Sequence, residues 1–291
     1  MTYKNTIQKT LSDLPDQINI LKESYLRTDD RNMYEGKMKD LYDYEKRMKE
    51  GLIFLQNIED PDVVESIEKI RECSRELTNK NTQRYLDSLK KHRKQQGIVV
   101  SQQDIDALIL EIQKVPLIHT TKNPEALQVS GIKPAAALWM TEHKSCANAM
   151  DIVLGLDKCV FLTHGFCLDV YSNDCVMIDN SLINKSTIVS SLDLFTFVLN
   201  KTQKNIPCAI ETEEWIDSLS EYSKHLFRGD DFWKIKAEYV LTFFLSLDEY
   251  HSFAKTHFYT NVFTKCPEGE VPFFGEIKVF QEIQSDCIHK N

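Results

Sequence analysis

Three short segments of the chain place a side chain capable of binding or catalysis beside apolar residues. His119 lies in the run LIHTT, Tyr171 follows the run CVFLTHG, and Glu238 lies in the run KAEYVL. An imidazole can exchange hydrogen bonds with a hydroxyl group, an aromatic ring can stack on a planar ligand, and a carboxylate can stabilise developing positive charge. Each residue taken alone also has an ordinary structural explanation, in a core, at a strand edge or on a solvent-facing strand position. Their order within one domain-sized stretch favours a common site.

The same segments resemble the ADP-ribosyltransferases. In that family the first core strand presents a His or an Arg, and a short helix and a Gly-containing turn follow, as in Pro124-Glu-Ala-Leu-Gln-Val and Ser130-Gly131-Ile-Lys-Pro. A second motif supplies an aromatic residue, often Tyr, that stacks on nicotinamide. A third, x-x-Glu followed by apolar residues, is the strand that carries the catalytic Glu. The resemblance is to the His-Tyr-Glu branch, which includes the poly(ADP-ribose) polymerases and several bacterial toxins and effectors.

This resemblance implies that the chain uses NAD as a substrate, releases nicotinamide and transfers a single ADP-ribose unit to a protein. Glu238 would be the catalytic carboxylate, because cleavage of the nicotinamide–ribose bond leaves an oxocarbenium-like sugar. His119 would bond a ribose hydroxyl of the adenosine half, and the backbone of Thr120 would hold the nicotinamide amide. Tyr171 would supply the stacking face. The other residues predicted to bind NAD belong to the same motifs: Thr121, Gly131 and Thr163.

The sequence departs from the family at one position and offers competitors at others. Transferases that modify arginine typically carry Glu or Gln two residues before the catalytic Glu, and Lys236 stands there instead. Arginine is therefore a poor candidate for the acceptor. Glu211-Thr-Glu213 is the main competitor for the acidic site, although it fits the start of a helix. Phe166 and Tyr222 are alternatives to Tyr171 as the stacking residue.

Composition and charge limit the other possibilities. Of the 291 residues 42% are hydrophobic and 27% are charged, which is typical of one large or two ordinary globular domains. Most of the net charge of −9 lies after residue 110, where 16 Lys and Arg accompany 24 Asp and Glu. An acidic functional half makes nucleic acid an improbable partner. Apolar runs such as 240–247 are far shorter than the roughly 20 residues of a membrane span, so we expect no membrane insertion.

The eight cysteines do not predict a metal site. No pair has C-x-x-C spacing, and the two C-x7-C intervals match no ligand pattern. Reduced thiols in a cytosolic protein are the simpler interpretation. The N-terminus also lacks the basic and apolar regions of a secretory signal, so we expect a cytoplasmic enzyme, or an effector delivered to a host cytosol.

The periodicity of apolar residues predicts an α+β protein with two parts. Residues 1–110 read as a helical bundle, and residues 111–291 as an ADP-ribosyltransferase-like split β-sandwich with short helices. The predicted strands are 117–121, 159–163, 174–178, 237–244 and 276–280. Ser101 is expected to cap a helix, and the basic cluster 90–94 is expected to be a solvated helix end. The helical bundle would pack on the second part or contact the protein target.

Two further functions remain open from the sequence. One is a non-enzymatic protein-interaction module, in which both parts serve as binding surfaces. The other is a Cys/His hydrolase that pairs Cys167 or Cys146 with His143 or His164, although neither cysteine lies in a recognisable nucleophile motif.

Overall fold

The computed structural model describes the chain in segments around an antiparallel β-sheet. The described residues are 3–26, 31–57, 61, 64–65, 67–68, 79–138, 151, 154–168, 174–194, 196–197, 221–258, 266–267 and 269–290. The helices are α1 (Tyr3–Leu26), α2 (Arg31–Gln56), α4 (Asn79–Gln96), α5 (Gln102–Ile112), α6 (Pro124–Ser130), α7 (Ala135–Leu138), α11 (Phe232–Phe243) and α12 (Leu247–His257). Short 3-10 helices are η1 (Leu156–Lys158), η2 (Asn180–Leu182), η3 (Gly229–Asp231) and η4 (Ser285–Cys287).

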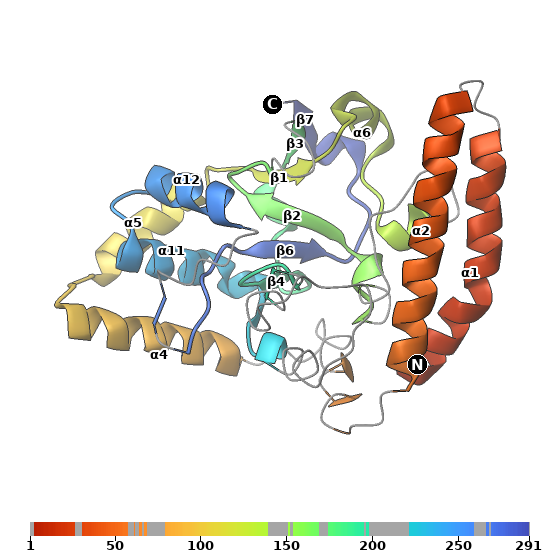
Figure 1. Ribbon diagram of the computed structural model, residues 1–291. Helices are drawn as coiled ribbons and strands as arrows, with labels where there is room; N and C mark the ends of the chain where they lie inside the picture. Colours follow the sequence, from red (N-terminus) through yellow and green to blue (C-terminus); the bar gives the residue numbers. More distant parts are fainter. Residues whose placement is uncertain are drawn as a thin grey trace.

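The strands are β1 (Leu117–Thr120), β2 (Val160–His164), β3 (Cys175–Ile178), β4 (Ile188–Ser190), β5 (Leu226–Arg228), β6 (Glu276–Val279) and β7 (Ile288–Lys290). Within the described residues they form one seven-stranded sheet in the order β5-β4-β6-β2-β1-β3-β7, with every pair antiparallel. Figure 1 places the sheet at the centre, with α4, α5, α11 and α12 on one side and α1 and α2 on the other. The α+β class is therefore confirmed.

The register around β1 is uneven. β1 pairs with β3 along its whole length, but with β2 only at Leu117↔His164 and Ile118↔Thr163. β2 itself continues to pair with β6 through Val160, Phe161 and Leu162. The two central strands therefore separate beyond Ile118, at the end of β1 that carries His119.

Four of the five predicted strands are present, as β1, β2, β3 and β6, but the strand predicted at 237–244 is wrong. Helix α11 occupies this stretch, and the buried residues of α11 include every residue from Ile235 to Val240. A helix buried on nearly all sides has no polar face, so its sequence lacks the 3.6-residue period that identifies amphipathic helices. Its aromatic and β-branched residues then read as a strand.

Helix α4 is joined to α11 by a buried ion pair. Arg93 and Glu238 are 6% and 2% exposed, and Arg93 Nη2 lies 2.5 Å from Glu238 Oε2. The guanidinium also donates to the Glu238 carbonyl at 3.3 Å and to Thr242 Oγ1 at 3.0 Å. The basic cluster does lie at the end of a helix, as predicted, but its Arg93 is a buried connection between helices and not a solvated charge.

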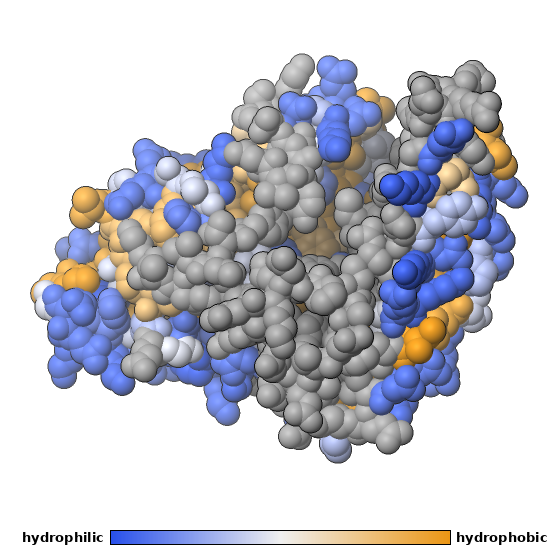
Figure 2. Space-filling view, viewed as in Figure 1, coloured by the Kyte–Doolittle hydropathy of each residue, from blue (hydrophilic) through white to orange (hydrophobic). Residues whose placement is uncertain are grey.

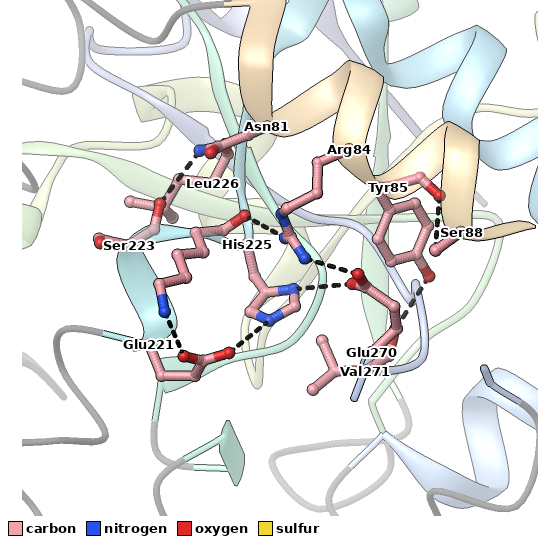
Figure 3. A network of polar contacts seen from close by, with 11 residues as sticks. Asn81, Arg84, Tyr85, Ser88, Glu221, Ser223, His225, Leu226, Glu270 and Val271 are labelled. Atoms are coloured by element: carbon pink, nitrogen blue, oxygen red, sulfur yellow. Dashed lines mark hydrogen bonds and ion pairs between the residues drawn. The ribbon is translucent and has the colours of Figure 1, made fainter. Parts of the chain in front are cut away.

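The first half of α4 holds two loops of the sheet region (Figure 3). Asn81 Nδ2 donates to the carbonyls of Ser223 and Leu226, and Arg84 bonds Glu270 Oε1 at 2.6 Å and the Lys224 carbonyl at 2.7 Å. Helix α5, which also packs on α11, begins with the predicted Ser101 cap as part of a capping box. Helices α4 and α5 are thus packed against the sheet region.

On the face shown in Figure 2, hydrophilic side chains predominate among the described residues and apolar side chains lie between them. Val99 and Leu245 are 93% and 98% exposed. Among the described residues no helix combines the length and the apolar character needed to cross a membrane.

The Arg93–Glu238 pair generates a stability prediction. Glu238→Gln should lower the free energy of unfolding by about 3 kcal/mol, because it leaves the Arg93 guanidinium buried without a counter-charge. Urea unfolding of this variant measures the loss, and Glu111→Gln, on the exposed face of α5, is the matched control. Equal unfolding midpoints for the Glu238 variant and the wild type would show that the pair contributes nothing.

Candidate functional site

His119 lies where β1 and β2 separate, and its side chain spans the gap. Its Nδ1 is 3.1 Å from the carbonyl oxygen of Phe161 on β2. A carbonyl oxygen only accepts, so Nδ1 carries the proton and Nε2 is the acceptor of the neutral ring. Burial lowers the pKa of His119 and the hydrogen bond to Phe161 raises it less, so the imidazole is neutral at pH 7. It is thus suited to accept a hydrogen bond from a ligand hydroxyl.

The two threonines after His119 bind neighbouring backbone. Thr120 Oγ1 accepts from the Leu168 amide at 3.1 Å and lies 3.5 Å from Cys167 Sγ. The Thr121 amide donates to the Asp174 carbonyl at 3.0 Å, and Thr121 Oγ1 accepts from the Asn123 amide. Both residues fix the loop that follows β1, so they can shape a site there mainly through the backbone.

Gly131 and Thr163 have structural contacts. Gly131 ends α6 at φ +75°, and a Cβ there would lie 2.5 Å from the Ile283 carbonyl oxygen, so only glycine fits. Thr163 is 4% exposed, and its hydroxyl donates to the Phe166 carbonyl at 2.5 Å. Neither residue directs a side chain toward His119. Gly131 stabilises the turn after α6, and Thr163 stabilises the turn after β2.

The aromatic candidates differ in their surroundings. Tyr171 lies outside the described residues, as does Glu211-Thr-Glu213. Phe166 is buried against His251 and Phe258, and Tyr222 is buried among polar groups near β4 and β6. Phe161 was not singled out from the sequence, although it belongs to the second motif. It is half-buried on β2, and its own carbonyl holds His119.

Glu238 does not face this region from a strand. It lies in the middle of helix α11, and its carboxylate is committed to Arg93 in a buried ion pair. The strand-borne position that the sequence predicted for it is therefore incorrect, because the stretch is helical. The run KAEYVL resembles the strand motif of the family because a helix that is buried on nearly all sides has apolar residues next to its Glu.

A different glutamate begins a strand next to β2. Glu276, 6% exposed, is the first residue of β6, and it lies opposite Ser190 of β4. Its Oε2 forms an ion pair with Lys278 Nζ and accepts a hydrogen bond from Ser190 Oγ at 3.3 Å. Alternation along β6 places Glu276 and Lys278 on one face of the sheet, and Lys278 lies opposite Phe161.

Lys278 is the centre of this cluster, which we call the β6 polar cluster: Ser190, Tyr222, Glu276 and Lys278. Lys278 Nζ donates to Ser190 Oγ at 2.6 Å and to the Tyr222 hydroxyl at 3.3 Å, and it lies 5.6 Å from the centroid of the Phe161 ring. Burial alone would lower the pKa of Lys278, but the Glu276 carboxylate and Tyr222 raise it above its usual value. The lysine is therefore charged.

The sequence carries one signal for Glu276. The run Glu276-Ile-Lys-Val-Phe predicts a strand, and its first residue, directly after Gly275, is an acid. KAEYVL is the better match to the family motif, because Lys278 interrupts the apolar run that follows Glu276.

A second buried cluster lies at the other end of β2 and contains three basic groups. Lys236 of α11 is fully buried, with Nζ 2.6 Å from His164 Nδ1 and 3.0 Å from His251 Nε2. Burial lowers the pKa of Lys236; burial and the charge of Lys236 lower the pKa of His251 to about 3. Gly165, at φ +84°, lets His251 approach, since a Cβ there would lie 2.5 Å from the His251 ring.

This cluster also bears on the hydrolase alternative. His164 is fully buried; its Nε2 bonds the Ile112 carbonyl at 3.1 Å and its Nδ1 contacts Lys236. Neither ring nitrogen is directed at Cys167, which lies beside Thr120. Cys146 and His143 lie outside the described residues. The Cys167–His164 pairing is therefore not assembled as a nucleophile and base.

Within the described part of the chain, no group of three or more His, Cys, Asp or Glu residues is arranged to hold a metal ion. Comparison with known proteins adds no relative: no family model, no curated protein and no solved structure matches the chain. The site must therefore be interpreted from its own geometry.

The basic cluster predicts a pH dependence of stability. A base whose pKa is lowered by folding binds protons more tightly when unfolded, so its effect is to destabilise the fold as pH falls below the unfolded value. For His251 this window runs from about pH 6.5 down to about pH 3. His251→Gln should make stability less sensitive to acid in that window, by at most about 1.4 kcal/mol per pH unit. Urea unfolding at a series of pH values measures it, with exposed His289→Gln as the control; parallel curves for wild type and His251→Gln would contradict it.

Proposed function

We propose that the protein is an NAD-dependent mono-ADP-ribosyltransferase that modifies a protein, with Glu276 as its catalytic carboxylate. The observation that carries the proposal is the adjacency of β1, β2 and β6 in one sheet. These strands carry His119, Phe161 and Glu276, the residue types that the resemblance associates with binding of the adenosine ribose, stacking on nicotinamide and catalysis. Two strand spacings of about 4.8 Å separate β1 from β6. Alternation places the His119 side chain on the face that carries Leu117 and His164, whereas Phe161 and Glu276 project from the other face, so a ligand that reaches all three would pass through the gap where β1 and β2 separate.

The carboxylate is assigned to Glu276 because it lies on a strand beside β2. In the reaction the bond between nicotinamide nitrogen and ribose C1′ breaks, and its electron pair leaves with nicotinamide. A nucleophilic atom of the acceptor forms the new bond to C1′ and releases its proton to solvent. A carboxylate held beside the ribose stabilises the positive charge that develops on the sugar. Glu238 has no such opportunity while it neutralises Arg93.

Phe161 is the best-placed aromatic residue for the nicotinamide ring. Its side chain points to the face of the sheet that carries Lys278, and it is half-buried and not fully enclosed. Its carbonyl holds His119 in the orientation that leaves Nε2 as acceptor. Stacking by Phe161 and hydrogen bonding by His119 are thus coupled through one residue.

The acceptor is a protein side chain other than arginine. With Glu276 as the catalytic residue, the position two residues earlier is Phe274, which is neither Glu nor Gln and is buried. The arginine-type motif is therefore missing here, as it was around Glu238. The acidic charge of residues 111–291 disfavours nucleic acid as acceptor. The N-terminal helices are available to contact the target.

The carboxylate assignment is tested by NAD turnover. Glu276→Gln should lower the release of nicotinamide and the transfer of labelled ADP-ribose to lysate protein by about 10²–10³-fold, because the charge that stabilises the transition state is lost. Glu282→Gln, an exposed neighbour, is the control. Glu276→Asp keeps the charge for the ion pair with Lys278 and should also lose most activity, because the carboxylate is withdrawn by one methylene. Full activity in a folded Glu276→Gln variant would reject the assignment.

The NAD-binding role of His119 is tested without turnover. Saturating NAD should raise the melting temperature of the wild type, and His119→Ala should remove most of this shift while retaining the fold. His289→Ala, on exposed β7, should respond to NAD like the wild type. No NAD-dependent shift in the wild type would instead support the non-enzymatic interaction module.

A further inference from the structure

The β6 polar cluster contains a cation that the resemblance does not account for. Lys278 is fully buried, two residues after the proposed catalytic Glu276 and on the same face of β6. A buried ammonium has three protons that need acceptors. Here Ser190 Oγ, the Tyr222 hydroxyl and Glu276 Oε2 provide them, so the position of Nζ is fully determined.

The contacts of Glu276 are concentrated on one of its oxygens. Oε2 pairs with Lys278 and accepts from Ser190 Oγ, whose own acceptor site is taken by Lys278. Among the described residues these are the hydrogen bonds and ion pairs of the Glu276 carboxylate. Holding Oε2 fixes the rotation of the carboxylate and leaves Oε1 as the oxygen that can face a ligand.

We infer that Lys278 is a positioning residue, which supplies the counter-charge of the buried Glu276 carboxylate and directs its Oε1 toward the ribose of NAD. The identity of the ligand, a ribose of NAD, rests on the proposed function. The charge coupling between Lys278 and Glu276 is independent of it. Without a nearby cation, a carboxylate this deeply buried would take up a proton rather than remain charged.

A neighbouring acid supports this division of charge. Asp193 follows β4, and burial together with the negative charge of Glu276 raises its pKa to about 7, although Thr196 and Lys278 act in the opposite direction. The cluster thus has one ammonium for two nearby carboxyl groups. The Lys278 ammonium forms its ion pair with Glu276, with which it is in direct contact. Asp193, whose pKa is raised, is the carboxyl group that takes up a proton.

The kinetic test compares Lys278→Gln, Lys278→Arg and the exposed control Lys185→Gln. At pH 7, Lys278→Gln should lower kcat for nicotinamide release about 10²-fold, with KM for NAD changed less than about twofold. The deficit should shrink as pH rises, because higher pH favours the charged form of a buried carboxyl group that has lost its counter-charge. Lys278→Arg should recover most of kcat. Wild-type kcat in a folded Lys278→Gln variant, or an equal loss at every pH, would overturn the inference.

A thermal test decides the charge coupling independently of turnover. In Lys278→Gln the buried carboxyl group without its counter-charge should hold a proton more tightly in the folded than in the unfolded state, so the melting temperature relative to the wild type should be highest in acid and fall as pH rises. The double variant Glu276→Gln/Lys278→Gln should show a smaller fall, because of the two carboxyl groups only Asp193, whose pKa burial raises, then remains. If the wild type releases no nicotinamide, the proposed function fails, while this comparison still tests Lys278. If Lys278→Gln does not fold but the double variant does, the coupling is supported; if neither folds, or both melt in parallel with pH, it is rejected.

Discussion

The structure depends on the register of β2, which pairs with β1 on one side and with β6 on the other. Because side chains alternate along a strand, this register sends Phe161 to one face and Leu162 and His164 to the other. A shift by one residue would exchange them, placing Phe161 against α11 and His164 beside Lys278. The candidate site and the buried basic cluster therefore have their positions set by the same hydrogen-bonded ladder.

The two faces of the sheet each bury a lysine side chain, Lys278 on one face and Lys236 on the other, in different surroundings. On one face Lys278 is matched by Glu276, so an ion pair persists in a dry environment. On the other face Lys236 meets two histidines, which supply acceptors, and no acid among the described residues pairs with it. Burial then favours the neutral amine and neutral rings. The first arrangement holds a carboxylate beside its counter-charge, whereas the second is expected to make folding sensitive to acid.

Helix α11 connects these features. Its Phe232 lies beneath Gly275, where a Cβ would approach the Phe232 ring to 2.8 Å, so the helix packs directly under the residue before Glu276. Its Glu238 receives Arg93 from α4. Through α4 the same packing reaches the loops around Glu270 and Leu226 (Figure 3). The element that the sequence offered as a catalytic strand is in fact a buried support.

The sequence by itself determined the α+β class, the strands β1, β2, β3 and β6, the helix capped by Ser101, and the place of His119 at the end of β1. These follow from local rules of alternation, capping and turn chemistry. Only the tertiary structure showed that Glu238 lies in a helix and that Glu276 lies on a strand of the sheet that contains His119. Burial on all sides erased the helical period around Glu238, and which acid shares a sheet with His119 depends on pairing between strands more than a hundred residues apart. The sequence also did not predict the counter-ions of these two glutamates. Arg93 pairs with Glu238 through helix packing and Lys278 pairs with Glu276 through strand register, not through a local motif.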